Sequence, residues 1–436
     1  MSSFIADAGP EAVRDYLASA FPGNRNAACF EGLAAFVCGA ASRLPRNLLA
    51  DSHDIHFVRL LQREAARRVG VTMADPVIQQ IGPELDFLEH TCQPSSLSAI
   101  QFACLILQCR RVPKRRVAVL VMARDEGVYL PEWLAHHQLL GAEHVFVYTN
   151  DNTDGSELLL RQLAFNNYIT LIEHKSAKGV NPQRKVYQHA LLLLDELRDY
   201  RWVLVIDADE FLNFGSTRPG ALPAFIHDME TALAHDLPAA VVFPWNWRYT
   251  NRAFHRDSVE LLREYPHAGL HTLVKPLVNL QSALAMCEVH IPTLDEQATI
   301  RDGQMRPIVG KAVWAGVERP YQGPVIEHFW AKSFLEFLVK KRRGDELALE
   351  EGLFRRDYSQ FFAWTQPWTA ENRSPISEVW ISQVKHRAAD ILAAPGVAAA
   401  YRAVIAGHRR NMTAMLQDPS LQRLYRDLVD SISPSM

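Results

Sequence analysis

The chain has 436 residues, which exceeds one ordinary domain and predicts a central domain with helical additions or two to three units. Hydrophobic residues make up 48% of the sequence and charged residues 22%, as in an ordinary soluble globular protein. The formal net charge of −3 gives no polycationic surface of the kind that binds nucleic acid or an anionic membrane.

The six cysteines show no C-x-x-C pairing, which favours reduced thiols in a cytosolic protein. The amino-terminal sequence is acidic and amphipathic, so no secretory signal is expected. The longest apolar stretch, residues 99–107, is too short to cross a bilayer. We therefore expect a cytoplasmic protein without a transmembrane segment; peripheral association with the inner face of the membrane remains compatible with the sequence.

Residues 1–112 show helical spacing of apolar residues, interrupted by prolines, and their role is not assigned. A proline-plus-basic linker at 112–116 opens a region in which strands and helices alternate, which is typical of a parallel sheet built from βαβ units. Its expected elements are strands at 117–123, 144–149, 168–172 and 203–206, and helices at 129–141 and 182–197. No G-x-G-x-x-G or P-loop motif follows these strands, so a dinucleotide fingerprint is not expected.

The most informative stretch is RWVLVIDADEFLNF, residues 201–214. Its apolar run reads as a strand buried on both faces and stops at Asp207, Ala208, Asp209 and Glu210. Side chains at i and i+2 of an extended chain point the same way, so Asp207 and Asp209 present two carboxylates to one place. A hard divalent cation that also binds phosphate oxygens suits such a place. The alternative interpretation is an acidic turn that caps the next element.

Beyond the acidic stretch we expect a helix at 220–235, strands at 239–244, 271–278 and 324–330, and a helix from about 331. The segment with Trp245, Trp247, Tyr249 and Phe254 suits a sugar-binding lip, or else a loop packed on the core by its aromatic rings. The predicted division is 1–112, a helical region; 113–345, the α/β domain; and 346–436, a second helical region.

Three blocks of this sequence resemble the family 2-like and family 92 glycosyltransferases. They are MARDEGVYLPEWLAHHQLLGAEHVFVYTNDNTDGS at 122–156, WVLVIDADEFL at 202–212 and EHFWAKSFLEFLVKKRRG at 327–344. The chain departs from the family pattern at Asp125, where Asn is more usual, and at Phe329 and Trp330, which replace the usual tyrosine region. The resemblance implies a GT-A (nucleotide-diphospho-sugar transferase) fold with a mostly parallel central sheet, flanked here by helical amino- and carboxyl-terminal regions.

The resemblance also implies which residues form the site. Asp207 and Asp209, with His328, would hold Mn²⁺ or Mg²⁺ on the diphosphate of a nucleotide-sugar donor, of the UDP-sugar type. The remaining donor-binding candidates lie at strand ends and in the late basic segment, where a solvated helix end is the competing interpretation for the basic residues: Arg124, Glu126, Asn150, Asp151, Lys185, Lys332 and Arg343.

The expected reaction is transfer of the sugar to a glycan or another hydroxyl acceptor, with inversion taken from the resemblance. A carboxylate would accept the proton of the attacking hydroxyl, and Asp257, Glu260 and Glu264 are the candidates. Two alternatives remain open at this point: another metal enzyme with strand-end carboxylates, such as a nucleotidyltransferase, and a catalytically silent protein that binds glycans or partners. The sequence leaves the sugar, the acceptor and the oligomeric state undetermined.

Overall fold

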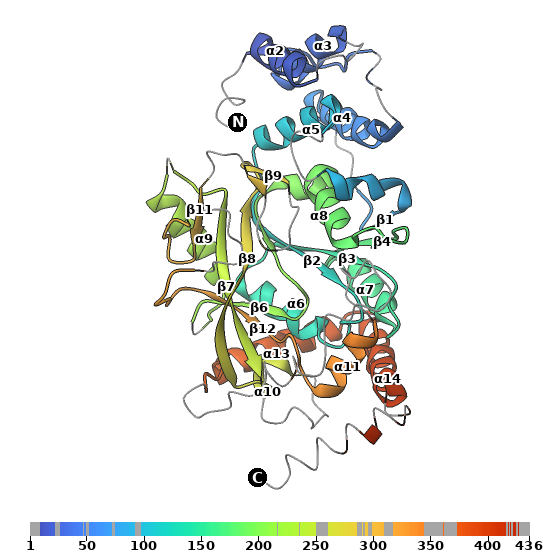
Figure 1. Cartoon of the computed structure of the whole chain (residues 1–436), viewed down its shortest axis with the longest axis vertical. Helices are drawn as coiled ribbons and strands as arrows, with labels where there is room; N and C mark the ends of the chain where they lie inside the picture. The colour runs from blue at the N-terminus through green and yellow to red at the C-terminus, as the bar shows by residue number, and fades with distance from the viewer. Residues whose placement is uncertain are drawn as a thin grey trace.

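The computed structural model describes most of the chain. The described residues are 9–21, 27–46, 48, 52–71, 75–91, 97–215, 217–234, 236–249, 260–285, 290, 293–294, 299–308, 317–343, 361, 373–415, 417, 419, 422–423 and 426. A mixed, mostly parallel sheet runs through the middle of the molecule with helices on both faces (Figure 1). The predicted α/β class and the parallel central sheet are therefore confirmed.

The described strands are β1 (Ile78–Ile81), β2 (Arg115–Ala123), β3 (His144–Thr149), β4 (Thr170–His174), β5 (Tyr200–Val205), β6 (Glu210–Asn213), β7 (Ala240–Tyr249), β8 (His267–Asn279), β9 (Ala283–Ala285), β10 (Thr293–Leu294), β11 (Ile300–Asp302) and β12 (Val325–His328). The described α-helices are α2 (Pro10–Ala20), α3 (Ala27–Val37), α4 (Ile55–Arg68), α5 (Ala99–Arg110), α6 (Leu130–Leu140), α7 (Ser156–Phe165), α8 (Pro182–Leu192), α9 (Ala221–Ala232), α10 (Leu261–Glu264), α11 (Phe334–Arg343), α13 (Glu378–Leu392) and α14 (Val397–Met415). Short 3₁₀ helices are η1 (Ser52–Asp54), η2 (Pro83–His90) and η4 (Asp195–Asp199).

The strand order of the main sheet is β1-β4-β3-β2-β5-β8-β7-β12-β6, and β11 pairs with β7. β1, β4, β3, β2 and β5 run parallel to one another, whereas β8 is antiparallel to both β5 and β7. Along the chain, β3 and β4 are added on one side of β2 and β5 is then added on its other side. This change of direction places a topological switch point between β2 and β5.

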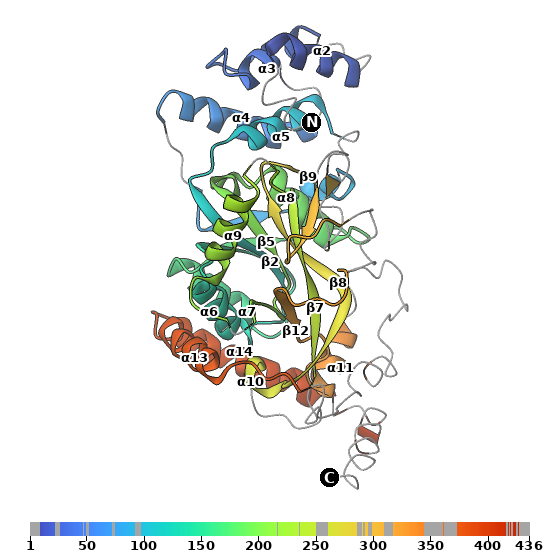
Figure 2. The ribbon, with the colours of Figure 1, turned by 90° about the vertical axis from the view of Figure 1, so that its left-hand side faces the viewer.

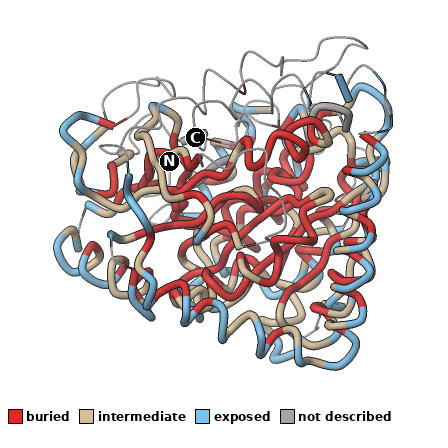
Figure 3. Tube along the Cα trace, turned by 90° about the horizontal axis from the view of Figure 1, so that it is seen from below, coloured by how far each residue is buried: buried red, intermediate tan, exposed pale blue. Residues whose placement is uncertain are grey.

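The two faces of the sheet carry separate cores, which explains the continuous apolar runs of the central strands. Ala118 and Leu120 of β2 pack into a core with the amino-terminal helices and α8. Val119 and Val121 of the same strand pack into a core with α6, α7, α9, α13 and α14. Seen along the long axis, the buried residues gather in the interior, where the sheet passes (Figure 3).

The amino-terminal region is helical as expected in α2, α3, α4 and α5, which lie at one end of the molecule (Figures 1 and 2). The expectation of helices alone was wrong for residues 78–81, because β1 joins the sheet parallel to β4, with Ile78 opposite Leu171. The four-residue sequence IQQI is too short for its periodicity to reveal a strand, and only pairing with β4 decides it. The three-part division of the chain stays a prediction.

The carboxyl-terminal helices α13 and α14 lie against α6 and α7 at the end of the molecule opposite the amino-terminal helices (Figure 2). Trp380 and Ile381 of α13 and Val404 of α14 are buried in the core on that side of the sheet. In the described part of the chain, no single helix has the length and apolarity needed to cross a membrane, and only the α13–α14 pair, bent by 109°, meets both conditions jointly.

Candidate active site at the carboxyl ends of the parallel strands

The two aspartates of the D-A-D-E stretch follow β5 at the carboxyl-terminal edge of the sheet, beside the switch point. Ligands of open α/β sheets bind in the crevice outside these strand ends. In the chain as it folds, both carboxylates are ion-paired with lysines. Lys275 Nζ lies 2.7 Å from Asp207 Oδ2, and Lys340 Nζ lies 2.5 Å from Asp209 Oδ2.

The sheet register explains why Lys275 reaches the acidic turn. β8 pairs antiparallel with β5, with Leu277 opposite Leu204, so Lys275 lies two residues further along, level with the end of β5. Its side chain is fully buried. Burial alone would lower the pKa of Lys275, but the charges of Asp207 and Glu210 outweigh it and raise that pKa. The ammonium group of Lys275 therefore stays charged beside Asp207 and Glu210.

Glu210 joins the two aspartates into one cluster. Its side chain is fully buried, its Oε2 accepts the Asp207 backbone N–H at 2.8 Å, and Lys275 Nζ lies 3.4 Å from the same oxygen. The other oxygen, Oε1, has no hydrogen-bond partner and lies 3.9 Å from His328 Nε2. Burial raises the pKa of Glu210 well above its usual range.

His328 ends β12 and faces the second aspartate. Its Nε2 lies 3.7 Å from Asp209 Oδ1, its side chain is buried, and its ring packs 4.2 Å from the Trp245 ring. Burial lowers the pKa of His328 well below its usual value, which favours the neutral imidazole. Burial alone would raise the pKa of Asp209, but the positive charges of Lys340 and Lys332 outweigh burial and lower that pKa.

The cluster continues to the end of β2 through Glu126. The Glu126 carboxylate is ion-paired with Lys332 and has Lys340 Nζ 3.4 Å away. Lys332 also lies 4.3 Å above the Tyr129 ring, and burial lowers its pKa to about 8. Lys340 thus bridges Glu126 and Asp209, and joins the strand ends on both sides of the switch point.

Two sets of buried hydrogen bonds hold the strands that carry this cluster. From α6, Trp133 Nε1 donates to the Glu210 carbonyl at 2.8 Å, and His136 Nε2 donates to the Leu212 carbonyl at 2.8 Å. On β12, the carboxylate of Glu327 accepts from Arg248 Nε at 2.5 Å and from two asparagine side chains, Asn213 at 2.6 Å and Asn246 at 2.9 Å. These bonds fix β6 and β12 where their side chains meet the cluster.

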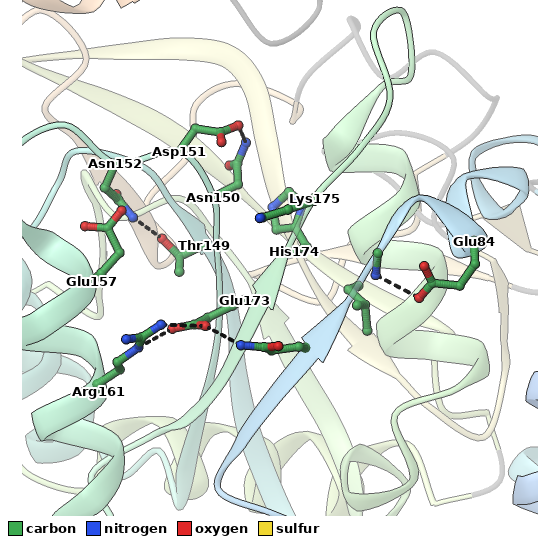
Figure 4. Close-up of a pocket in the computed structure, with 13 residues that line it drawn as sticks. Glu84, Thr149, Asn150, Asp151, Asn152, Glu157, Arg161, Glu173, His174 and Lys175 are labelled. Atoms are coloured by element: carbon green, nitrogen blue, oxygen red, sulfur yellow. Dashed lines mark hydrogen bonds and ion pairs between the residues drawn. The ribbon is translucent and has the colours of Figure 1, made fainter.

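A separate cavity of about 580 Å³ lies at the ends of β1, β3 and β4. Asn150 and Asp151 line it on one side, and Glu84 of the amino-terminal region lines it on the other (Figure 4). His174 also lines it, and neither ring nitrogen of this buried side chain has a hydrogen-bond partner. Arg124 Nε donates to the Asp151 carbonyl at 3.4 Å, which ties the end of β2 to the Asp151 side of the cavity.

Aromatic rings continue from His328 along β7 and β8. Trp247 stacks on His271 with centroids 4.3 Å apart and planes at 7°, and lies nearly parallel to Trp330 at 6.2 Å. Trp245, packed on His328, lies 6.5 Å from Trp247. Trp245 and Trp247 of the predicted sugar-binding lip therefore adjoin the charged cluster, whereas Phe254 lies outside the described residues. The role of this segment in sugar binding stays a prediction.

The other predicted site residues lie elsewhere. The Lys185 ammonium is fully buried and donates to three oxygens, at the Gly82 carbonyl, the Asp86 carboxylate and the Lys175 carbonyl. It thereby ties the amino-terminal region to the β4–α8 loop, and its role in donor binding stays a prediction.

Of the three candidate bases, Glu260 pairs with Lys385 at 2.8 Å and Glu264 ends α10, whereas Asp257 lies outside the described residues. Arg343 ends α11, and its side chain is likewise not described. Glu260 also pairs with Arg263 at 3.2 Å, and the choice of base among the three carboxylates stays a prediction.

Asp207, Asp209 and His328 are the side chains of the cluster that could hold a divalent cation. Within the described part of the chain, no three His, Cys, Asp or Glu side chains are already arranged to hold a metal ion. Both ion pairs, however, use the Oδ2 oxygen, so Oδ1 of Asp207 and Oδ1 of Asp209 remain to face a cation, beside His328. Carboxylate oxygens are the ligands that Mg²⁺ and Mn²⁺ prefer. The types of these side chains therefore suit such an ion, with each aspartate binding its lysine through Oδ2 and the ion through Oδ1.

Comparison with protein families identifies the region that carries the switch point. The family model of Glycosyltransferase family 92 matches residues 118–296. This stretch is a glycosyltransferase family 92 domain. The family 92 domain runs from β2 past β8, so it contains Asp207, Asp209, Glu210 and Lys275, whereas His328, Lys332 and Lys340 follow it in the chain.

Curated family 92 proteins of plants are similar to part of the chain. One from Arabidopsis thaliana is 28% identical over 111 residues, which cover 26% of this chain and 19% of that protein. One from Oryza sativa subsp. japonica is 30% identical over 98 residues, covering 22% and 16%, and one from Ricinus communis is 26% identical over 98 residues, with the same coverage. The similarity thus spans less than a fifth of these relatives, and supports the domain rather than the whole protein.

The sequence predicts Glu126, the two aspartates, His328 and Lys332 as site residues, together with a basic segment at 340–343 that includes Lys340, but it does not predict Glu210 or Lys275. Glu210 was noticed only as a third acid in a row, and nothing singled out Lys275 in the stretch HTLVKPLV. A charged residue inside an otherwise apolar strand that flanks the family 92 site was the available signal, because a buried lysine requires an acidic partner.

Proposed function

We propose that this chain is a glycosyltransferase that moves a sugar from a nucleotide-sugar donor, a UDP-sugar, to a hydroxyl of a glycan acceptor. One observation carries the proposal: the family 92 domain places three carboxylates and a buried lysine at the switch point between β2 and β5, and the segment after it adds His328 and two more lysines. The strand order around this point supports a GT-A type fold.

The nucleoside end of the donor is proposed to lie against Arg124 and the turn of Asn150 and Asp151. Three residues, Arg124 to Glu126, connect that turn to the charged cluster, so the cavity wall and the cluster are neighbours along one edge of the sheet. The diphosphate would then lie at the cluster. A divalent cation held there by Asp207 and Asp209 would neutralise the charge that develops on the departing diphosphate.

The acceptor is proposed to approach over the aromatic rings of Trp247 and Trp330, because the apolar face of a sugar ring packs on aromatic side chains. Its hydroxyl would lose a proton to one of the carboxylates Asp257, Glu260 and Glu264. The proposal includes inversion at the anomeric carbon, which NMR of the product decides directly.

The test begins with a thermal-shift panel of nucleotide sugars and nucleoside triphosphates in Mn²⁺. A ligand that binds only the folded chain stabilises it by RT ln(1 + [L]/Kd), so the donor should raise the melting temperature. The selected donor is then incubated with oligosaccharide acceptors, and product and nucleoside diphosphate are measured by chromatography.

Asp209→Asn should slow transfer roughly 10²–10³-fold, and the matched variant Asp228→Asn, which alters an exposed acid on α9, should keep the wild-type rate. Turnover of nucleoside triphosphates without sugar transfer would replace the proposal by a nucleotidyltransferase. Binding of glycans with no turnover of any nucleotide would make the chain a binding protein on this fold.

A further inference from the structure

The two aspartates of the cluster are already neutralised by this chain's own lysines. Lys275 comes from β8 and Lys340 from α11, elements far apart in the sequence, and each contributes its ammonium group to one aspartate at 2.7 Å and 2.5 Å. The Lys275 side chain is fully buried, and that of Lys340 is 10% exposed. Two buried ammonium groups are costly to maintain, and a purely structural strand end requires neither of them.

The charges of the cluster cancel. With the buried Glu210 as the neutral acid, three carboxylates (Glu126, Asp207 and Asp209) face three ammonium groups (Lys275, Lys332 and Lys340), which leaves a formal charge of 3 − 3 = 0. A divalent cation alone would turn this buried cluster positive. A divalent cation together with the two singly charged phosphates of a nucleotide sugar would restore the original charge. The cluster is therefore balanced for joint binding and unbalanced for either ligand alone.

We propose that Lys275 and Lys340 are diphosphate-binding groups that rest on Asp207 and Asp209 in the free chain. When the donor binds, the two ammonium groups exchange the aspartate oxygens for phosphate oxygens, and both oxygens of each aspartate become available to the cation. The long flexible stem of lysine permits this exchange without movement of the backbone. The inference rests on the proposed function, and it adds that the cation and the diphosphate bind as one unit.

Geometry next to the lysines supports an exchange of partners. Glu210 Oε1 is buried without a hydrogen bond, as is His328 Nδ1, so the cluster contains polar atoms that its present contacts do not satisfy. Lys340 also keeps Glu126 at 3.4 Å, so its ammonium group retains a carboxylate after it leaves Asp209. Unsatisfied groups beside movable ion pairs are expected where a ligand completes the network.

The test measures Mn²⁺ binding rather than catalysis. Free Mn²⁺ is followed by electron paramagnetic resonance in the presence of the full chain, with and without UDP, GDP, CDP, ADP or dTDP. In the wild-type chain, the matching nucleoside diphosphate should raise the Mn²⁺ affinity tenfold or more. By linkage, Mn²⁺ should raise the affinity for that nucleotide by the same factor.

The lysine variants separate this exchange from simple charge attraction. In Lys275→Met and in Lys340→Met, Mn²⁺ alone should bind tenfold or more tightly than in the wild type, because a competing cation is gone, while the nucleotide should bind more weakly. The control Lys114→Met removes an exposed lysine, 66% exposed, that precedes β2 at the opposite edge of the sheet. It should leave both affinities unchanged. Thermal unfolding checks that each variant is folded, and Lys340→Met decides alone if Lys275→Met does not fold.

Two results would overturn the inference. One is a Mn²⁺ affinity of the wild type that no nucleoside diphosphate changes; the other is lysine variants whose Mn²⁺ affinity equals that of the wild type. Failure of this inference can be distinguished from failure of the proposed function, because only the latter shows as an absence of sugar transfer. A chain that transfers sugar while its Mn²⁺ affinity ignores the nucleotide refutes the exchange and leaves the glycosyltransferase intact.

Discussion

The ion pair between Asp209 and Lys340 provides the sharpest test of how this site is built. Asp209→Asn keeps the shape of the side chain but removes its charge, and leaves a buried ammonium group on Lys340. Breaking one side of a buried pair costs roughly 3–5 kcal/mol. We expect Asp209→Asn to lower the unfolding free energy by about 3 kcal/mol. This is the lower end of that range, because Lys340 keeps Glu126 at 3.4 Å.

The double variant Asp209→Asn/Lys340→Met distinguishes a pair from two independent side chains. Lys340→Met alone leaves the buried Asp209 carboxylate facing a neutral His328, and should also cost about 3 kcal/mol. Removing both charges leaves neither partner uncompensated, so the double variant should recover most of the loss, with a coupling free energy of about 2 kcal/mol or more. Urea unfolding of the four proteins, followed by circular dichroism, measures each value.

In these four proteins, the substitutions should affect stability and activity differently. Release of nucleoside diphosphate from the nucleotide sugar should fall roughly 10²–10³-fold in Asp209→Asn, as expected when one electrostatic contact to a developing charge is lost. The double variant should regain stability but not turnover. Single variants as stable as the wild type, with effects that simply add, would refute the reasoning, and so would an Asp209→Asn protein with unchanged turnover and Mn²⁺ dependence.

Three further predictions concern the scaffold. Lys185→Met should lower the unfolding free energy by about 3 kcal/mol and expose the segment around β1 to limited proteolysis, whereas Lys175→Met, an exposed lysine on the same loop, should do neither. Burial lowers the pKa of His136 to about 4, from 6.5. The stabilising contribution of the neutral His136 is therefore present above pH 6.5 and is lost as the pH falls toward 4. Between pH 7 and pH 5, the unfolding free energy of the wild type, measured in urea, should fall by about 2 kcal/mol more than that of His136→Gln. Equal losses in the two proteins would contradict this. In Gly407→Ala the new Cβ would lie 2.1 Å from a backbone carbonyl of the β3–α7 turn, which should cost about 1–3 kcal/mol, while Gly269→Ala, with its nearest atom at 3.4 Å, should be tolerated in the same measurement.

The central strands were predictable because burial on both faces leaves a signature in the sequence itself. The runs at 117–123 and 144–149 appear as β2 and β3 within two residues of the expected bounds, and the acidic stretch follows β5 as predicted. The strand-end position of Asp207 and Asp209 could be inferred from local pattern alone, because the carboxyl ends of parallel strands share one edge.

The partners of those aspartates could not be inferred in the same way. Lys275 is a single charge in an apolar strand, and nothing local to HTLVKPLV shows that it is buried rather than exposed. Only the antiparallel insertion of β8 between β5 and β7 brings it under Asp207. The same limit explains β1, whose four residues acquire a strand conformation only through pairing with β4.

The sequence by itself determined the α/β class, the parallel sheet and the place where acidic side chains gather, because these follow from runs and spacings between near neighbours in the chain. The tertiary structure alone decided which cations face the acids: Lys275 lies 68 residues from Asp207 along the chain, and Lys340 lies 131 residues from Asp209. Electrostatic partners are selected by distance in space, and distance across a sheet depends on strand order and register, which local patterns do not encode.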